Sequence, residues 1–591
     1  MIRAFLSRFD FVKSLSNLRR ILTGTELFQC LMIVGLTVIG AGLDIILVGL
    51  IPATVAVLSD PGQLQKLPLV GGLMPDLAGV SSLTLLKYST LGILVVGGAK
   101  LGFYFVMYWC QLTVGRRIRV RISEKLLETY LAAPWEFHIG ASRVELLRNL
   151  VTDTRELIIG VVQPMISVIH SFVLTTLILI AMLVTLQGRI IFVFGLIAVS
   201  IVVILSLLSN FLRKNGVNAK LQNKVVSRGA NEALAHFLEA TFYGCRGWFV
   251  RRFSQSVDEF SVSQNKLQLV SRLLPSILEF VTLVGVMGLV LVLTLASGSI
   301  ENILPEITLI AVGAVRLRQS TAILAGSFAA MQFNVPSLQH LSKDLESLKH
   351  YPIKLVEKIE RSVFDVGLEL KSISFEYPNS NAPVLKNVNL TIAPGESIAI
   401  VGETGCGKST LLRMILGLQI PASGQMLLDG KLLHENLGGW QANIGYVPQK
   451  ICLLDGTIGE NIALGVDGGD IDREKMRLAM DASSLRGVVE SSPDGLETMI
   501  GDDGSMLSGG QRQRIGIARA IYRQPNVFVL DEATSALDEE TEMSVMRALE
   551  SLPWTVTIIL VTHRLKAVEA LDRVVEVRKG SIVPLPGSYS G

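Results

Sequence analysis

The sequence predicts an α-helical membrane domain followed by a separate α/β domain. Of its 591 residues 50% are hydrophobic and only 18% are charged, with a mean hydropathy of +0.48. Such a chain is too apolar for an ordinary soluble protein and too long for one domain. Around residues 348–366 the composition becomes charged, and alternating strands and helices with glycine-rich turns follow. We place the boundary near residue 355.

Six stretches are apolar over the roughly 20 residues that a helix needs to span a bilayer. They are residues 28–56, 88–111, 158–185, 190–211, 274–296 and 303–327. The loops after the second and fourth stretches are long and rich in Lys and Arg, whereas the outward turns at 186–188 and 296–301 are short and nearly free of them. This bias predicts that the long loops and both termini are cytosolic. The expected parts are a membrane domain over 25–350, a linker over 351–365 and the α/β domain over 366–591.

Three shorter segments are expected to be amphipathic. Residues 1–24 combine basic residues with spaced phenylalanines, which favours an interfacial helix over a plain solvated leader. The long loops are expected to extend the spans as helices and to turn near 134–139 and 239–248. The aromatic residues of these turns suit an anchor at a membrane interface.

Charge and cysteine content exclude several other classes. The net charge of +3 is spread over the whole chain, so no basic face for nucleic acid is indicated. The five cysteines form no C-x-x-C pair and no zinc-ligand spacing, which favours reduced thiols.

A phosphate-binding loop follows the apolar strand at 397–401. The run reads G-E-T-G-C-G-K-S-T and supplies Gly402, Gly405, Cys406, Gly407, Lys408, Ser409 and Thr410. Glycines let backbone N–H groups converge on phosphates at a helix N-terminus, Lys408 reaches the β- and γ-phosphates, and Ser409 offers its hydroxyl to Mg²⁺. The motif in this strand–loop–helix context predicts ATP and Mg²⁺ as ligands.

A second apolar strand, at 527–530, ends in Asp531 and Glu532. Alone, this pair has a structural capping role about as often as a chemical one. Beside a phosphate-binding loop it predicts that Asp531 organises the Mg²⁺ shell and that Glu532 acts as general base toward the attacking water.

The run Leu507-Ser508-Gly509-Gly510-Gln511 matches the signature motif of the ABC ATPase family without a substitution. The resemblance implies a RecA-like nucleotide-binding domain with a helical subdomain, whose signature helix end meets the γ-phosphate held by a partner domain. It also implies that Tyr377 stacks on adenine, that Gln449 senses the γ-phosphate and Mg²⁺, that Asp538 lies in the cross-dimer loop and that His563 is the switch histidine. In ABC exporters the turns near 134–139 and 239–248 would be the coupling helices. Residues 501–504 resemble the loop that touches these helices, although Asp502 replaces the usual Glu.

The chain carries one set of each motif and no internal repeat, so it supplies half of a two-fold machine. An N-terminally fused membrane domain of six spans resembles the type I ABC exporters. The implied partners are a second half-transporter, most simply an identical chain, and membrane lipids. A heterodimer stays open.

Charged residues at membrane depth are candidates for the substrate path because their burial in lipid is costly. They are Asp44, Lys100, Arg272, Glu279, Arg316 and Arg318. Arg272 and Glu279 share one helix stripe, while Arg316 and Arg318 are about 200° apart, so only one of the two arginines faces a cavity. Guanidinium groups suit phosphate or pyrophosphate, which favours an amphipathic, anionic or lipid-linked substrate. The alternative is an interhelical ion pair, for example with Glu279.

Residues 316–318 and 333–338 are similar to the sixth-span region of bacterial lipid-linked oligosaccharide flippases. The sequence thus predicts an ATP-driven exporter or flippase in a bacterial inner membrane. The alternatives are a peptide or multidrug exporter and, from another class, an ABC-type channel or regulator. A channel is disfavoured because the catalytic motifs are intact.

Overall fold

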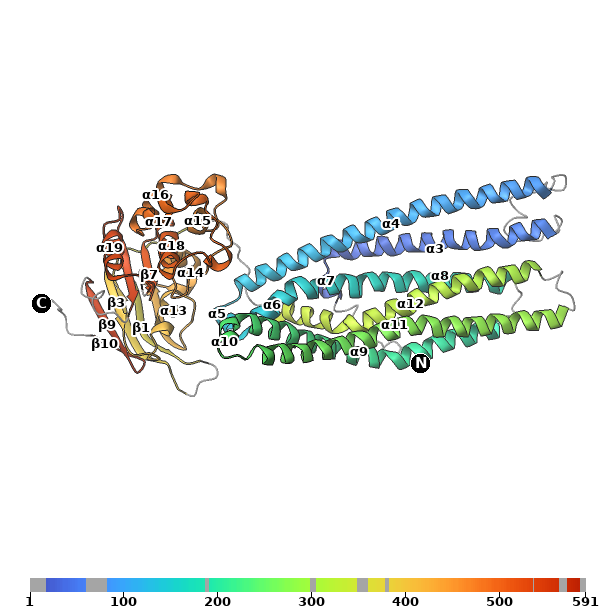
Figure 1. The fold of residues 1–591 in the computed structure, drawn as a ribbon, viewed down its shortest axis with the longest axis horizontal. Helices are drawn as coiled ribbons and strands as arrows, with labels where there is room; N and C mark the ends of the chain where they lie inside the picture. Colours follow the sequence, from blue (N-terminus) through green and yellow to red (C-terminus); the bar gives the residue numbers. More distant parts are fainter. Residues whose placement is uncertain are drawn as a thin grey trace. The chain divides into compact units, whose positions relative to one another are not determined.

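The computed structural model describes residues 18–59, 82–185, 191–297, 304–347, 360–377, 382–534, 536–562 and 571–584. The chain forms two compact units (Figure 1). The first comprises Met1–Ala133 with Phe137–Lys354, and the second comprises Leu355–Gly591 with the short segment Pro134–Glu136.

The first unit is built from long helices. They are α3 (Gly24–Ser59), α4 (Ser82–Ala132), α8 (Gln163–Thr185), α9 (Ile191–Ala235), α11 (Arg246–Ser297) and α12 (Leu304–Ser347). The described residues contain 5 helices long and apolar enough to cross a membrane. The remaining expected span, 190–211, falls in α9, where most of the apolar side chains lie outside the described set. At 51 and 52 residues, α4 and α11 are far longer than a span requires, which confirms the expected helical extensions.

Short helices form both expected turns. Helix α5 (Trp135–Gly140) and helix α6 (Arg143–Arg148) follow α4, and α10 (Phe237–Phe242) separates α9 from α11. The second turn begins two residues before the expected 239, and Trp248 belongs to α11. Most of the expected helix at 1–24, of the external segment at 59–86 and of the linker at 351–365 lies outside the described residues.

The stretch of α12 that resembles the flippases is packed against two glycines. A Cβ on Gly216 of α9 would lie 2.2 Å from the Phe333 carbonyl oxygen, and one on Gly160 would lie 2.4 Å from the Asn334 amide. Gly160 belongs to the π-helical segment Ile158–Val162, one of two such segments between α6 and α8. Close backbone contact therefore explains part of this sequence pattern without reference to a substrate.

The second unit contains a six-stranded sheet of order β10-β9-β3-β8-β7-β6. Its strands are β3 (Ser397–Val401), β6 (Ile444–Val447), β7 (Val527–Asp531), β8 (Thr557–Val561), β9 (Arg573–Arg578) and β10 (Ser581–Pro584). All pairs are parallel except β9 with β10. The central strands are apolar runs buried along nearly their whole length, as a parallel sheet covered on both faces requires.

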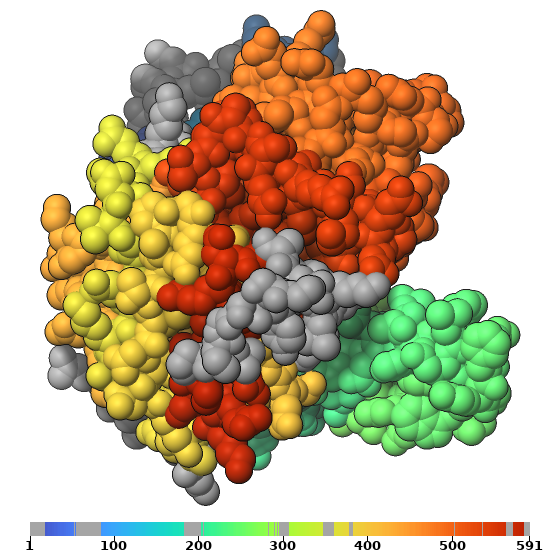
Figure 2. Space-filling model, turned by 90° about the vertical axis from the view of Figure 1, so that its left-hand side faces the viewer, coloured from blue at the N-terminus to red at the C-terminus, as the bar shows by residue number. Residues whose placement is uncertain are grey.

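A second, antiparallel sheet of order β2-β1-β4-β5 shares a core with one face of the first. It comprises β1 (Leu368–Phe375), β2 (Leu385–Ile392), β4 (Ser423–Leu428) and β5 (Lys431–Leu432). Helices α15 (Ile458–Ile462), α16 (Arg473–Ala482), α17 (Arg486–Ser491) and α18 (Gly509–Tyr522) pack with α19 (Glu539–Glu550) around a second core. Figure 2 shows the yellow strand layer and the orange helices on opposite flanks of this unit, with red C-terminal segments between them.

The parallel sheet brings the expected nucleotide-site segments to one edge. The loop at 402–407 follows β3, Asp531 ends β7, and Gln449 comes two residues after β6. The carboxyl ends of parallel strands share an edge, which is where ligands bind in open α/β sheets.

Candidate functional site

The phosphate-binding loop depends on glycine at three positions. Gly402, Gly405 and Gly407 have φ values of 150°, 82° and 113°, in the region that side chains rarely adopt. A Cβ at Gly402 would lie 2.3 Å from the Val577 carbonyl oxygen, whereas a Cβ at Gly405 would meet nothing within 4 Å. The loop therefore packs against β9 at its start and is open at its middle. Gly407 ends it as the N-cap of α13 (Lys408–Ile415).

The first turn of α13 carries two buried side chains and one exposed side chain. Lys408 is buried and its Nζ donates to the carbonyl oxygens of Gly402 and Glu403, at 2.6 and 2.8 Å. Ser409 is exposed and Thr410 is buried. The Lys408 ammonium thus lies over the loop in which phosphates bind in such motifs.

Tyr377, just beyond β1, reaches the same helix. Its hydroxyl shares a hydrogen bond of 3.1 Å with the Thr410 hydroxyl, and Arg413 Nη1 donates to it at 3.0 Å. The antiparallel sheet therefore brings an aromatic ring to the helix that follows the loop. Arg413 is a neighbour that sequence reasoning did not identify.

Glu532 and Gln449 meet directly. Gln449 Nε2 donates to Glu532 Oε2 at 2.6 Å, although the two residues are 83 positions apart. Glu532 has a φ of 50°, and its N–H donates to the Val561 carbonyl at 3.0 Å. A non-glycine residue held at positive φ is strained, and such strain is concentrated at functional sites.

Asp531 lies in a partly buried environment beside a second acid. Burial, and then the negative charge of Glu532, raise the pKa of Asp531 above its usual value. The Tyr446 hydroxyl donates to Asp531 Oδ2 at 3.4 Å, and burial together with the Asp531 charge raises the pKa of Tyr446 to about 12. A bound cation would relieve the repulsion between the two carboxylates. Sequence reasoning missed Tyr446. This residue lies in β6, which pairs with β7 in the sheet.

The raised pKa of Asp531 predicts that its ionised form lowers stability. A carboxyl group whose pKa is higher in the folded than in the unfolded chain contributes stability at low pH that is lost as pH rises through the folded pKa. Asp531→Asn is therefore expected to raise the thermal unfolding midpoint of the nucleotide-free protein by a few degrees at pH 7–8, with a smaller difference near pH 4. Differential scanning fluorimetry in chelator-containing buffer measures this.

Asp572→Asn is the matched control with the opposite sign. Asp572 Oδ2 accepts hydrogen bonds from the backbone N–H and hydroxyl of Ser397, at 2.8 and 2.6 Å, and these bonds lower its pKa. Its replacement is expected to lower the midpoint at neutral pH. Equal shifts in the two variants would refute the electrostatic explanation.

The signature segment forms a reciprocal cap at the start of α18. The Gln511 N–H donates to Ser508 Oγ at 3.3 Å, and the Ser508 N–H donates to Gln511 Oε1 at 2.8 Å. Ser508 and Gly509 are exposed, and a Cβ on Gly510 would lie 3.2 Å from the Ala536 carbonyl. The cap orders an accessible helix N-terminus, which favours anions.

The remaining predicted positions have mixed outcomes. Asp538 is the N-cap of α19, where Thr541 donates to it through its N–H at 3.0 Å and its hydroxyl at 2.8 Å and lowers its pKa. His563 and the side chain of Asp502 lie outside the described residues. Within the described ranges no group of three or more His, Cys, Asp or Glu side chains could hold a metal ion.

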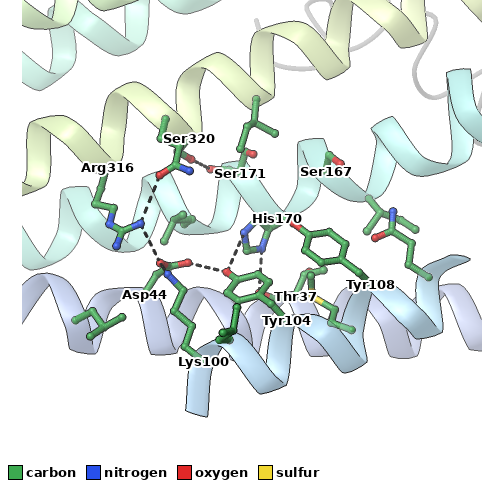
Figure 3. Close-up of a pocket in the computed structure, with 18 of the residues that line it drawn as sticks. Thr37, Asp44, Lys100, Tyr104, Tyr108, Ser167, His170, Ser171, Arg316 and Ser320 are labelled. Atoms are coloured by element: carbon green, nitrogen blue, oxygen red, sulfur yellow. Dashed lines mark hydrogen bonds and ion pairs between the residues drawn. The ribbon is translucent and has the colours of Figure 1, made fainter. Parts of the chain in front are cut away.

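A separate cavity of about 480 Å³ lies within the first unit, between α3, α4, α8 and α12 (Figure 3). Its charged lining residues are Asp44, Lys100 and Arg316, and Tyr104 and His170 contribute polar rings. Asp44 accepts hydrogen bonds from Lys100 Nζ and, at 2.7 Å, from the Tyr104 hydroxyl. Arg316 Nη1 lies 3.6 Å from Asp44 Oδ1.

The cavity separates the candidates for the substrate path. Arg316 lines it, whereas Arg318 forms an ion pair of 3.5 Å with Glu279, and neither of these two residues nor Arg272 is among the lining residues. The expectation that only one of the two arginines faces a cavity agrees with this arrangement. The interhelical ion pair with Glu279 is formed by Arg318. Tyr104 and His170 were missed because their sequence context gives no signal of shared burial.

A membrane domain of long apolar helices joined to one nucleotide-binding domain with a P-loop and a signature motif defines an ABC half-transporter. Family profiles match both parts: the ABC transporter transmembrane region over residues 27–312 and the ABC transporter domain over residues 385–535. The chain belongs to the ABC transporters and is a multi-pass membrane protein. It is an exporter that binds ATP and couples its hydrolysis to transport.

Several curated proteins are similar to it. The ATP-dependent lipid A-core flippase of Photobacterium profundum is 28% identical over 560 residues, which are 92% of each chain. The protein of the same name from Pseudoalteromonas translucida is 28% identical over 503 residues, 84% of this chain and 85% of that one. The ABC multidrug transporter MDR2 of Trichophyton rubrum is 39% identical over 261 residues, 44% of this chain and 19% of that one.

The fold has a solved counterpart. A bacterial Atm1-family ABC exporter with ATP bound superposes with a TM-score of 0.77 over 95% of both chains, at 18% identity. The type I exporter fold expected from the sequence is thereby confirmed.

Proposed function

We propose that this chain works as a dimer in a bacterial inner membrane and uses ATP to move an amphipathic anionic lipid out of the cytosolic leaflet. The observation that carries the proposal is the cavity of about 480 Å³ with Lys100 and Arg316 in its wall. Cationic groups at membrane depth are costly unless they serve an ion or an anionic ligand. Relatives named as lipid A-core flippases support a lipid substrate.

In the proposed nucleotide chemistry, different residues bind the phosphates, stack on adenine and activate the attacking water. Lys408 and the N–H groups of the loop bind the β- and γ-phosphates, while Tyr377 stacks on adenine. Glu532 takes the proton of the attacking water, and the hydrogen bond of 2.6 Å from Gln449 orients its carboxylate. His563 would complete the site as the switch residue at the γ-phosphate.

The donors at this edge fit Mg²⁺, which is held by one or two protein oxygens together with substrate phosphates. Asp531 and the exposed hydroxyl of Ser409 would hold it, with Gln449 nearby. When bound, the ion neutralises phosphate charge during phosphoryl transfer. The raised pKa of Asp531 supports this role, because a carboxylate beside Glu532 gains from a cation.

The exposed N-terminus of the signature helix α18 supports dimerisation. Ser508, Gly509, Gly510 and Gln511 would bind the γ-phosphate held by the P-loop of a second copy, with Asp538 in the adjacent cross-dimer loop. ATP then joins two nucleotide-binding domains, and hydrolysis releases them. The short helices α5 and α10 would carry this motion into the membrane helices.

A flipping assay in proteoliposomes tests the lipid substrate. Fluorescent phosphatidylglycerol is reconstituted with wild-type protein, and its loss from one leaflet is followed by dithionite quenching after addition of ATP. Arg316→Gln removes a cation from the cavity wall and is expected to lower the flipping rate about tenfold or more, because an anionic headgroup loses its charge-assisted bond. ATP-dependent flipping in the wild type supports the proposal.

Arg318→Gln is the matched control, since it removes the same group two positions away, at an ion pair outside this cavity. Its flipping rate is expected to stay close to that of the wild type. A peptide or multidrug exporter would instead show ATPase stimulation by those compounds alone and would tolerate Arg316→Gln. That result would overturn the lipid proposal and leave the exporter assignment intact.

A further inference from the structure

Asp44 is the centre of the charged cluster in the cavity. Its side chain is 6% exposed and lies between Lys100 and Arg316, which come from different helices. One carboxylate oxygen faces both cations and the other accepts the hydrogen bond from Tyr104. In Figure 3, Arg316 of α12 points toward Asp44 of α3 across the cavity. Two hydrogen bonds and one ion pair therefore hold this buried carboxylate in place.

The cluster leaves one positive charge unmatched. Lys100, Arg316 and Asp44 are the charged side chains among the described residues that line the cavity. The nearest titratable ring on α8 is His170, whose Nε2 lies 3.5 Å from the Tyr104 hydroxyl and whose Nδ1 lies 3.2 Å from the Thr37 carbonyl oxygen. Two cationic side chains and one carboxylate give the charged lining residues a single net positive charge.

The two cations differ in their distance from Asp44 and in their exposure. Lys100 contacts Asp44 directly and its side chain is 18% exposed, whereas the Arg316 guanidinium lies 3.6 Å from the same oxygen and is 30% exposed. Arg316 Nη1 also donates to Gln319 Oε1 at 3.4 Å, and both residues line the cavity. A guanidinium offers five N–H donors, so it retains the capacity to bind a phosphate group.

We propose that Asp44 sets the charge of the substrate: the cavity selects a lipid with one negative charge, such as a single phosphodiester, over a lipid with a dianionic phosphomonoester. This inference rests on the lipid substrate proposed above and narrows it. One negative charge on the headgroup neutralises the net charge of the cluster, whereas a second would be left without a partner at membrane depth, which is costly. A cavity of about 480 Å³ accommodates a headgroup of this size.

Binding of two short-chain lipids to the full-length protein in phosphatidylcholine nanodiscs tests the proposal. The probes are dioctanoyl phosphatidylglycerol and dioctanoyl phosphatidic acid at pH 8, where the phosphomonoester is dianionic. The wild type is expected to bind phosphatidylglycerol about tenfold more tightly. Asp44→Asn adds one net positive charge and is expected to reverse this preference.

Two further variants keep the test decisive if Asp44→Asn does not fold. The double variant Asp44→Asn with Lys100→Met restores a single positive charge and is expected to restore the preference for phosphatidylglycerol. Lys100→Met alone leaves no net charge and is expected to weaken binding of both anionic lipids about tenfold. Glu279→Gln removes a carboxylate from the ion pair outside this cavity and is expected to leave the ratio of affinities unchanged.

The outcomes separate this proposal from the proposed function. A preference that stays within twofold of the wild type in Asp44→Asn, or that changes equally in Glu279→Gln, overturns the role of Asp44 while a lipid substrate stands. Failure of the wild type to bind either anionic lipid above the phosphatidylcholine background overturns the lipid substrate itself.

Discussion

Glu532→Gln is expected to lower the ATPase rate by about 10²–10⁴-fold, the usual contribution of a general base. The amide cannot accept the proton of the attacking water, but its oxygen still accepts the hydrogen bond that Gln449 Nε2 donates at 2.6 Å. The site should therefore keep its geometry and its affinity for ATP. Phosphate release by the purified protein in lipid nanodiscs, with binding of a fluorescent ATP analogue beside it, measures both quantities.

Glu550→Gln is the control, because Glu550 is exposed at the C-terminal end of α19. Its ATPase rate should stay close to that of the wild type. A Glu532→Gln variant that retains more than a third of the wild-type rate would exclude this residue as the base. Absence of ATPase activity from the wild-type protein alone would instead mean that a second, different half-transporter is needed.

Gly402→Ala is expected to destabilise the nucleotide-binding domain by about 2–6 kcal/mol, from backbone strain and overpacking of similar size. The added methyl group would lie 2.3 Å from the Val577 carbonyl oxygen, an atom of the β9 backbone that cannot move without the sheet. Any relaxation must displace the loop itself, so ATP affinity should fall at least about tenfold. Thermal unfolding and ATP-analogue binding measure the two effects.

Gly405→Ala isolates the contribution of the clash. Gly405 also has positive φ, at 82°, but a Cβ there meets nothing within 4 Å. It should cost only the strain of about 1–3 kcal/mol and leave ATP binding less affected. Equal losses in the two variants would show that contact with β9 is unimportant.

Both domains could be predicted because their signals are local. A helix buried in lipid must satisfy its backbone within itself, so each span is an unbroken apolar run. Residues 28–56 fall in α3, and residues 304–327 of the last expected span fall in α12. The P-loop is likewise one continuous segment between β3 and α13. The start of α10 was misplaced by two residues, because a turn between two long helices has no strong boundary signal.

The contacts between residues of the nucleotide site were harder to predict from the sequence. Gln449 and Glu532 could each be identified by resemblance, but their direct contact depends on β6 and β7 being neighbours in the sheet. Tyr446 and Arg413 have no motif of their own, and only the sheet order and the packing of α13 bring them to Asp531 and Tyr377. Strand order depends on long-range contacts, and local patterns in a single sequence do not predict it.

By itself, the sequence determined the class of the protein and the phosphate-binding loop, because each depends on residues that are consecutive or related by helix periodicity. Only the tertiary structure decided which membrane charges share a cavity. Asp44, Lys100 and Arg316 are distant in sequence and belong to three helices, whose rotation about their axes is set by side-chain packing. Helix periodicity separates Arg316 from Arg318, but packing selects Arg316 for the cavity and leaves Arg318 with Glu279.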